Sequence, residues 1–113
     1  MGVFNGMFPI AKGKEEAARA FAAEVAGPRH ADFRAHHERA NNTRETWAMQ
    51  ETPMGSFLLV WFEGDLEKAF GDLATHQSEY SAWFRAKVLE LTSVDLGAPP
   101  QGPLPEVLID WRK

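Results

Sequence analysis

The segment RHADFRAHHER, at positions 29–39, concentrates side chains that can move protons. His30, Phe33 and His37 follow an i, i+3, i+7 spacing, so they would share one face of a helix, and Arg34 flanks His37. Imidazole exchanges protons near neutral pH, and a guanidinium stabilises an anion. We therefore predict His30, Arg34 and His37 as catalytic residues and Phe33 as a ligand contact. The alternative is a partly exposed polar face whose histidines bond to backbone or water.

Aromatic side chains suggest what such a site would hold. Three of the four tryptophans could line an apolar pocket for a flat aromatic molecule: Trp47, Trp61 and Trp83. Asn5 would add a polar contact from the first predicted strand. His76 and Tyr80, four residues apart at a helix start, could pair as acid and base at the pocket mouth. The alternatives are that the tryptophans form core and interface, and that Tyr80 belongs to the core.

The sequence predicts neither a metal site nor a bound cofactor. His30 and His37 are two helical turns apart, about 10 Å along the axis, which is too far for one ion. Asp32 and His36 have a suitable i, i+4 spacing, but no third ligand is identifiable. Phosphate loops, nucleotide-binding fingerprints and nucleophile elbows are also missing from the sequence.

Composition narrows the class of protein. The chain has 113 residues, of which 44% are hydrophobic and 25% charged, and this is ordinary for one globular domain spanning 1–113. Without cysteine there is no disulfide, thiolate metal site or cysteine nucleophile. A net charge of −4 argues against a nucleic-acid partner. Because neither a signal peptide nor a membrane span is recognisable, we expect no membrane partner and a cytoplasmic location.

The first half of the chain predicts one strand, a helical region and a second strand. Residues 3–10 (VFNGMFPI) are typical of a strand that ends near Pro9. A helix then begins at Glu15 and Glu16, and the Gly27-Pro28 pair separates it from a second piece over 29–40. This region is either one kinked helix or two helices end to end. Residues 44–51 form the second predicted strand.

The second half predicts a hairpin and further helices. Residues 52–55 (TPMG) indicate a turn, and the apolar run 56–63 (SFLLVWFE) indicates a central strand paired antiparallel with 44–51. Asp65 and Ser78 are predicted helix caps before two amphipathic stretches that end near residues 75 and 91. Residues 97–105 hold four prolines and predict an extended arm. Residues 107–111 (VLIDW) would form a short strand or a docking tail.

This order, βαββα(α)β, predicts an α+β fold of the ferredoxin-like type: one antiparallel sheet with helices on one face. The opposite face also needs a cover. We expect Trp47, Met49 and alternate residues of the strand at 56–63 to make that face too apolar to remain in water. Two copies packed sheet to sheet would cover it, so the sequence predicts a homodimer.

Several motifs together resemble a known group of proteins. They run through most of the chain: Phe8-Pro9-Ile10, Gly13-Lys14, Trp47, Thr52-Pro53, Gly55, Trp83-Phe84 and Asp110-Trp111. The pattern resembles uncharacterised bacterial proteins of the dimeric α/β-barrel superfamily. That superfamily includes cofactor-free monooxygenases of aromatic polyketides, polyketide cyclases and haem-degrading enzymes, so the fold leaves the activity open.

The resemblance and the candidate residues together give a first expectation. It is a small-molecule-binding homodimer, with cofactor-independent chemistry of the monooxygenase or cyclase type on an aromatic or polyketide-like compound. Two alternatives stay open at this point. One is a non-catalytic structural or interaction protein, and the other is a haem-binding protein that uses one of the four histidines.

Overall fold

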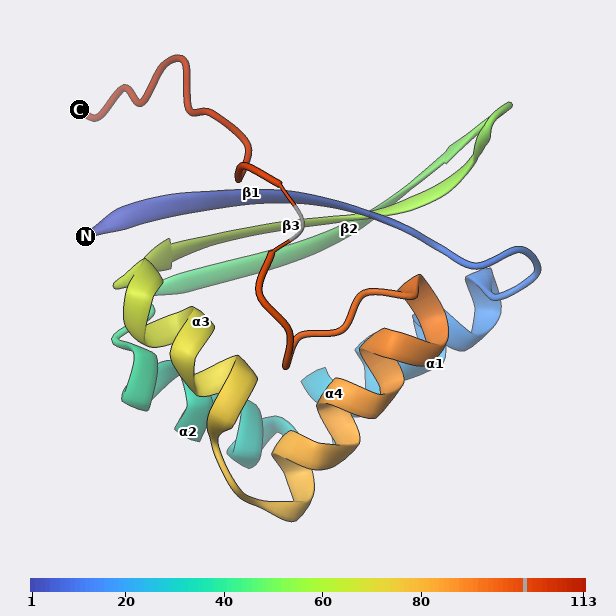
Figure 1. Ribbon diagram of the computed structural model, residues 1–113, viewed down its shortest axis with the longest axis horizontal. Helices are drawn as coiled ribbons and strands as arrows, with labels where there is room; N and C mark the ends of the chain where they lie inside the picture. The colour runs from blue at the N-terminus through green and yellow to red at the C-terminus, as the bar shows by residue number, and fades with distance from the viewer. Residues whose placement is uncertain (101) are drawn as a thin grey trace.

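The computed structural model describes residues 1–100 and 102–113 of an α+β fold (Figure 1). Among these residues, four helices accompany a three-stranded antiparallel sheet. The elements in chain order are β1 (Gly2–Pro9), α1 (Glu15–Ala26), α2 (His30–Ala40), β2 (Arg44–Thr52), β3 (Gly55–Gly64), α3 (Leu66–Thr75) and α4 (Glu79–Thr92). None of the described helices is long and apolar enough to cross a bilayer.

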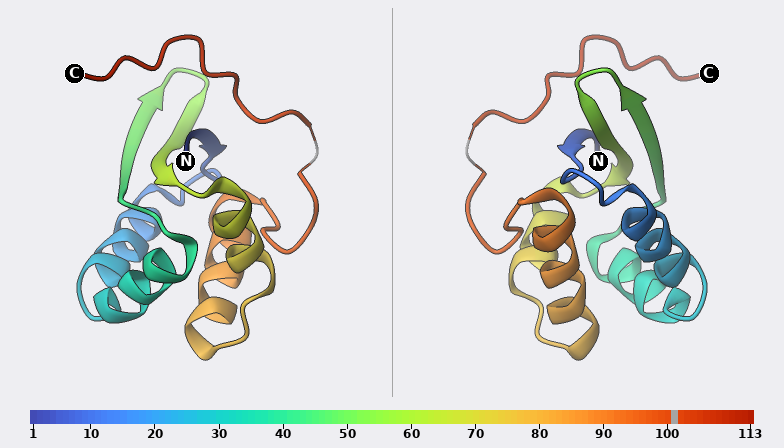
Figure 2. Two further views of the ribbon diagram at one scale, coloured as in Figure 1. Left: turned by 90° about the vertical axis from the view of Figure 1, so that its left-hand side faces the viewer. Right: turned by 90° about the vertical axis from the view of Figure 1, so that its right-hand side faces the viewer.

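The sheet has the order β1-β3-β2, which confirms that the apolar run of β3 is the central strand. Both neighbours pair with β3 antiparallel, and β2 joins it through the predicted hairpin. Helices α1 and α2 form the connection from β1 to β2. All four helices lie against the same face of the sheet (Figure 2), as the sequence predicts.

The ends of the helices follow local chemistry. The side chain of Asp65 accepts a hydrogen bond from the backbone N–H of Lys68, and that of Ser78 accepts one from Ser81, so both predicted caps are confirmed. Gly27 follows α1 directly, and α2 begins three residues later, so the region contains two helices end to end. Helix α2 ends at Ala40, and the next residue, Asn41, has a left-handed φ of 55°.

The core lies between the sheet and the helices. One buried cluster joins helices α1 and α4, with Phe21, Val25 and Phe84 among its members, and a second centres on Phe4 and Phe62 of the sheet. Aromatic rings meet edge to face or tilted throughout; Phe4 and Phe62, for example, have centroids 5.1 Å apart. The cavity described below lies between these two clusters.

The prediction that Trp47 and Met49 point away from the helices is wrong, because both pack against the α1–α4 core. Side chains alternate along a strand, and the inward positions of β2 are therefore the odd-numbered ones from 45 to 49. The opposite sheet face, called the outer face below, is nevertheless largely apolar along β3. It carries the apolar Val3, Met7, Ala48, Phe57, Leu59 and Trp61 and the polar Asn5, Arg44, Thr46, Gln50 and Glu63.

The C-terminal segment differs from the predicted closing strand. Residues 104–113 (the C-terminal tail below) contain no helix or strand, so the described residues lack the last strand of the ferredoxin-like pattern. The tail instead approaches the outer face, where Val107, Ile109 and Trp111 form a hollow with Val3 and Trp61. A strand needs a neighbouring main chain to pair with, and a segment crossing a sheet face finds only side chains.

Candidate functional site

An apolar cavity of about 70 Å³ lies between the sheet and the helices. Its wall is built mainly of aromatic rings, from all three strands and all four helices, including Phe4, Phe21, Phe33, Trp47, Phe62 and Phe84. Among the described residues, the polar side chains in this wall are those of His36, Glu45 and Thr92. The chain therefore places an imidazole and a carboxylate against an otherwise mainly apolar interior.

A larger cleft of about 660 Å³ adjoins this cavity. The two share Phe4, Phe8, Phe70, Leu73 and Leu96 in their walls. The far wall of the cleft is the arm that follows α4, which crosses in front of the gap between α3 and α4 (Figure 1). Ligand sites usually occupy about 300–1,000 Å³, so the cleft has the size of a ligand site and the inner cavity does not.

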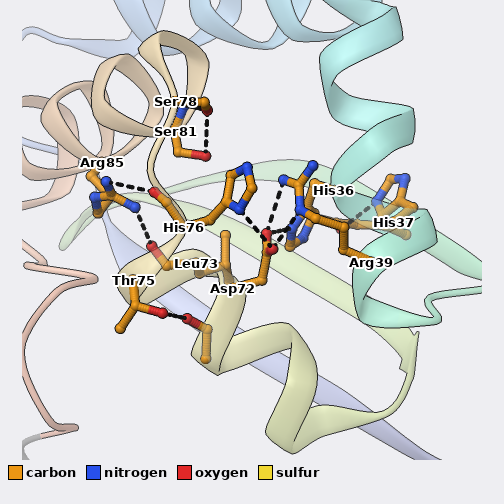
Figure 3. A network of polar contacts seen from close by, with 12 residues as sticks. His36, His37, Arg39, Asp72, Leu73, Thr75, His76, Ser78, Ser81 and Arg85 are labelled. Atoms are coloured by element: carbon orange, nitrogen blue, oxygen red, sulfur yellow. Dashed lines mark hydrogen bonds and ion pairs between the residues drawn. The ribbon is translucent and has the colours of Figure 1, made fainter.

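Asp72 is the centre of a polar network that joins His36, Arg39 and His76 (Figure 3). The ring of His36, which also lines the cavity, is buried, and its Nδ1 lies 2.6 Å from Oδ2 of Asp72. Arg39 donates to the other oxygen of Asp72 through Nε at 2.6 Å, and His76 Nδ1 lies 3.8 Å from it. Asp72 therefore fixes the orientation of His36 and is itself fixed by Arg39.

Burial and polar contacts shift the pKa values of His36 and Asp72 in opposite directions. Burial of the ring lowers the pKa of His36 and outweighs the hydrogen bond with Asp72, which acts to raise it. Burial also acts to raise the pKa of Asp72, but the hydrogen bonds from Arg39 and His36 outweigh it, so that pKa is lowered. A neutral imidazole thus donates Nδ1–H to an ionised carboxylate, and Nε2 keeps its lone pair.

Glu45 forms a second polar group beside the first. Its side chain is 9% exposed, and its two oxygens accept hydrogen bonds from different donors. Trp47 donates Nε1–H to Oε2 at 2.6 Å, and Nε2 of His37 lies 2.9 Å from Oε1. Phe33 packs edge-on against His37, with centroids 4.2 Å apart. These contacts hold a carboxylate inside the fold, where it would otherwise be costly.

The hydroxyl of Tyr80 is buried and has no hydrogen-bond partner within the described part of the chain. Burial raises the pKa of this phenol well above its usual range, so it stays protonated and can donate. The ring shares a small hollow with His36, Asp72 and Ser81. An orphaned donor beside the imidazole is the kind of group that a bound molecule or water would satisfy.

Of the residues predicted as catalytic, the structure brings only His37 into the network. His30 is exposed, and Arg34 is exposed and paired with Glu38 on its own helix at 3.1 Å. Both occupy the solvent side of α2, which matches the alternative of a polar helix face. A catalytic role for either of them remains a prediction.

The predicted ligand contacts divide between two places. Phe33 and Trp47 line the cavity, whereas Asn5 and Trp61 pair in register on the outer face. Trp83 packs against Phe21 in the core and lies under the guanidinium of Arg29, 4.2 Å from ring centroid to Cζ. Nδ1 of His76 lies 3.8 Å from Asp72, and Tyr80 lines a small hollow with His36 and Asp72; no hydrogen bond joins His76 to Tyr80.

Sequence reasoning did not assign His36, Glu45 or Asp72 to the site, and it weighed His36 only as a metal ligand together with Asp32. Asp72 is 36 residues from His36, so no local spacing connects them. A signal for Glu45 does exist, because it shares its strand face with Trp47 and Met49, and a carboxylate between apolar inward positions needs partners.

Comparisons with known proteins add no assignment. No family model matches the chain, no curated protein is significantly similar to it, and no solved structure is significantly similar to its fold.

Proposed function

We propose that the chain binds a small, flat, mainly apolar molecule of the aromatic or polyketide type between the sheet and the helices. The observation that supports this is the aromatic cavity that ends at His36 and adjoins a cleft of about 660 Å³. Apolar walls with a few fixed polar groups are the usual composition of a ligand site. The ligand would occupy the cleft under the arm and reach the cavity past Leu73.

The polar end of the cavity supports proton transfer without a cofactor. Nε2 of His36 would accept a proton from the bound molecule while Asp72 stabilises the resulting imidazolium. Arg39 holds Asp72 in place through two hydrogen bonds at 2.6 and 3.2 Å. The unpaired hydroxyl of Tyr80 would donate a hydrogen bond to the anion that forms. This assigns the general base to His36 and the electrophilic contact to Tyr80.

Filling the entrance tests the binding site. Leu73→Trp would place a large ring where the cavity and cleft meet, because Leu73 lines both. Leu89→Trp makes the same exchange at a half-exposed position of α4 and serves as the control. The probe is 2-naphthol, titrated calorimetrically against the native chain and both variants.

We expect binding by the native chain and by Leu89→Trp, and at least a tenfold loss of affinity in Leu73→Trp. Overpacking costs about 1–3 kcal/mol of stability, so far-UV circular dichroism must first establish that both variants are folded. Equal binding by both variants would remove the cleft from consideration.

A homodimer formed through the outer face is the second part of the proposal. Met7 is 64% exposed there, and Phe57, Leu59 and Trp61 form a continuous row along β3 beside it. Leu108, Ile109 and Trp111 of the C-terminal tail are 83%, 86% and 77% exposed on the same side. Apolar surfaces of this extent usually mark an interface.

A further inference from the structure

One ligand atom from each of His36, His37 and Glu45 lies within 4.8 Å of the other two. Two imidazole nitrogens and one carboxylate oxygen form a donor set that Zn²⁺ accepts in proteins. We propose that these three side chains bind one divalent transition-metal ion, with Zn²⁺ as the reference ion. Around a tetrahedral ion the donor atoms stand roughly 3.3 Å apart, so only small side-chain movements are needed.

The contacts behind the three donors support this assignment. Histidines that bind metals usually give their second nitrogen to a carboxylate or carbonyl, which fixes the ring and raises its basicity. Nδ1 of His36 is held in this way by Asp72 at 2.6 Å, which leaves Nε2 for an ion. Glu45 is held by Trp47 through its other oxygen at 2.6 Å. Two of the three donors therefore have an outer partner already in place.

The balance of donors and acceptors also favours a cation. With Nδ1 of His36 held by Asp72, the nitrogen left for an ion is Nε2, and Glu45 offers a carboxylate oxygen; one ligand atom from each side chain lies within 4.8 Å of the other. His37 reaches the same carboxylate at 2.9 Å through Nε2. A metal ion would replace the proton shared by His37 and Glu45 and would be coordinated by both. Such replacement is how a carboxylate and a neutral imidazole become ligands.

Three protein ligands leave a fourth position open, as in catalytic zinc sites. His36 and Glu45 both line the apolar cavity, so that position would face its interior. A water molecule bound to the ion at that position would have a pKa of about 7, and it would take over the proton-accepting role assigned above to His36. The metal site rests on the proposed ligand site only for this last step, because the ion can bind with the cavity empty.

The experiment is equilibrium dialysis of the tag-free chain against Zn²⁺ without any organic ligand, followed by elemental analysis. We expect one ion per chain, and visible d–d bands when Co²⁺ replaces Zn²⁺. His37→Ala and Glu45→Gln should each weaken binding at least tenfold, and Asp72→Asn should weaken it roughly 10- to 100-fold. Absence of saturable binding below 100 μM, about −5.5 kcal/mol, would overturn the proposal.

Two matched controls exclude other sites. His30→Ala removes an exposed histidine from the same helix, and His76→Ala removes the histidine on the far side of Asp72. Both should bind as the native chain does, and loss in either would show that the ligands are assigned wrongly. If His37→Ala and Glu45→Gln fail to fold, the native Co²⁺ complex decides. Paramagnetically shifted ring protons from two histidines support the proposal, and signals from none or one overturn it.

Discussion

At the scale of single residues, folding moves the ring of His36 into a very different environment. The ring leaves water, keeps one strong partner in Asp72, and lines an apolar cavity. Its environment is therefore different in the folded and unfolded chains, and the difference must appear as a dependence of stability on pH.

The sign of that dependence follows from the pKa shifts. The pKa of His36 falls below its ordinary 6.5 on folding, so the unfolded chain takes up this proton at a higher pH than the folded chain. The contribution of His36 to the free energy of unfolding should be complete above pH 6.5 and should decrease as the pH falls below that value. Asp72, whose pKa is below its ordinary 3.8, adds a second loss below that value. Urea unfolding between pH 3 and 8, with a chelator present, measures both.

A matched pair of variants tests whether His36 causes the loss of stability below pH 6.5. His36→Gln should flatten the curve just below pH 6.5, because the group that binds the proton is gone. His30→Gln should leave the slope unchanged, since His30 is exposed in the folded chain. Equal slopes in the native chain and His36→Gln would mean that burial does not perturb His36.

Glu45 leads to a second prediction at this scale. Trp47→Phe keeps an aromatic ring but removes the N–H that satisfies Oε2 of Glu45. A hydrogen bond to a charged group is worth about 1.5–3 kcal/mol, and we expect a loss of stability in that range. Trp83→Phe is the control, because it makes the same exchange in a residue packed against Phe21 and Tyr80. Similar losses in the two variants would show that ring volume, and not the hydrogen bond, accounts for the effect.

The candidate site was only partly predictable, and particular residues show why. The helical spacing correctly brings Phe33 and His37 to one face, because that relation is local. The partners of His36 and Glu45 depend on how α2 meets α3 and β2, and no periodicity encodes a contact between elements that are far apart in sequence. His30 shares the predicted face but lies at the first residue of α2, where the helix projects into solvent.

At the scale of elements, most of the fold follows from local rules. Helices α3 and α4 begin at the predicted caps Asp65 and Ser78, and β3 is recognisable because a continuous apolar run is typical of a strand in the interior of a sheet. The exception is 107–111, which has strand-forming residues but no adjacent backbone edge to pair with. The residue types favour an extended conformation, but a strand forms only where an adjacent backbone edge is available for pairing.

The cap of α3 gives a prediction at this scale. Asp65→Ala removes the acceptor for the N–H of Lys68 and should cost about 1 kcal/mol of unfolding free energy. Glu67→Ala removes an acidic side chain in the same first turn without removing the cap. It should cost only about 0.3–1 kcal/mol through the helix dipole. Chemical denaturation compares the two, and a larger loss in Glu67→Ala would contradict the capping role.

At the scale of the whole molecule, the outer face and the C-terminal tail together would form the proposed dimer interface. Three strands about 4.8 Å apart and about 27 Å long present roughly 400 Å² of flat area. A standard interface buries about 800 Å² on each partner. The sheet alone falls short of that, so the exposed apolar side chains of the tail would supply the remainder. Arg112 fixes the tail near the sheet through an ion pair with Glu63 at 2.9 Å.

Two changes should therefore separate the subunits to different degrees. Leu59→Arg places a charge at the middle of the outer face, between Met7 and Ala48 in register, and we expect monomers by sedimentation velocity. Deletion of 104–113 removes only the part of the interface that the tail supplies, and it should weaken the dimer without abolishing it. Leu89→Arg, on the exposed side of α4, should stay dimeric. A native chain that sediments at 12.7 kDa at every concentration would refute the dimer, yet the cavity would remain, because every residue that lines it comes from one chain.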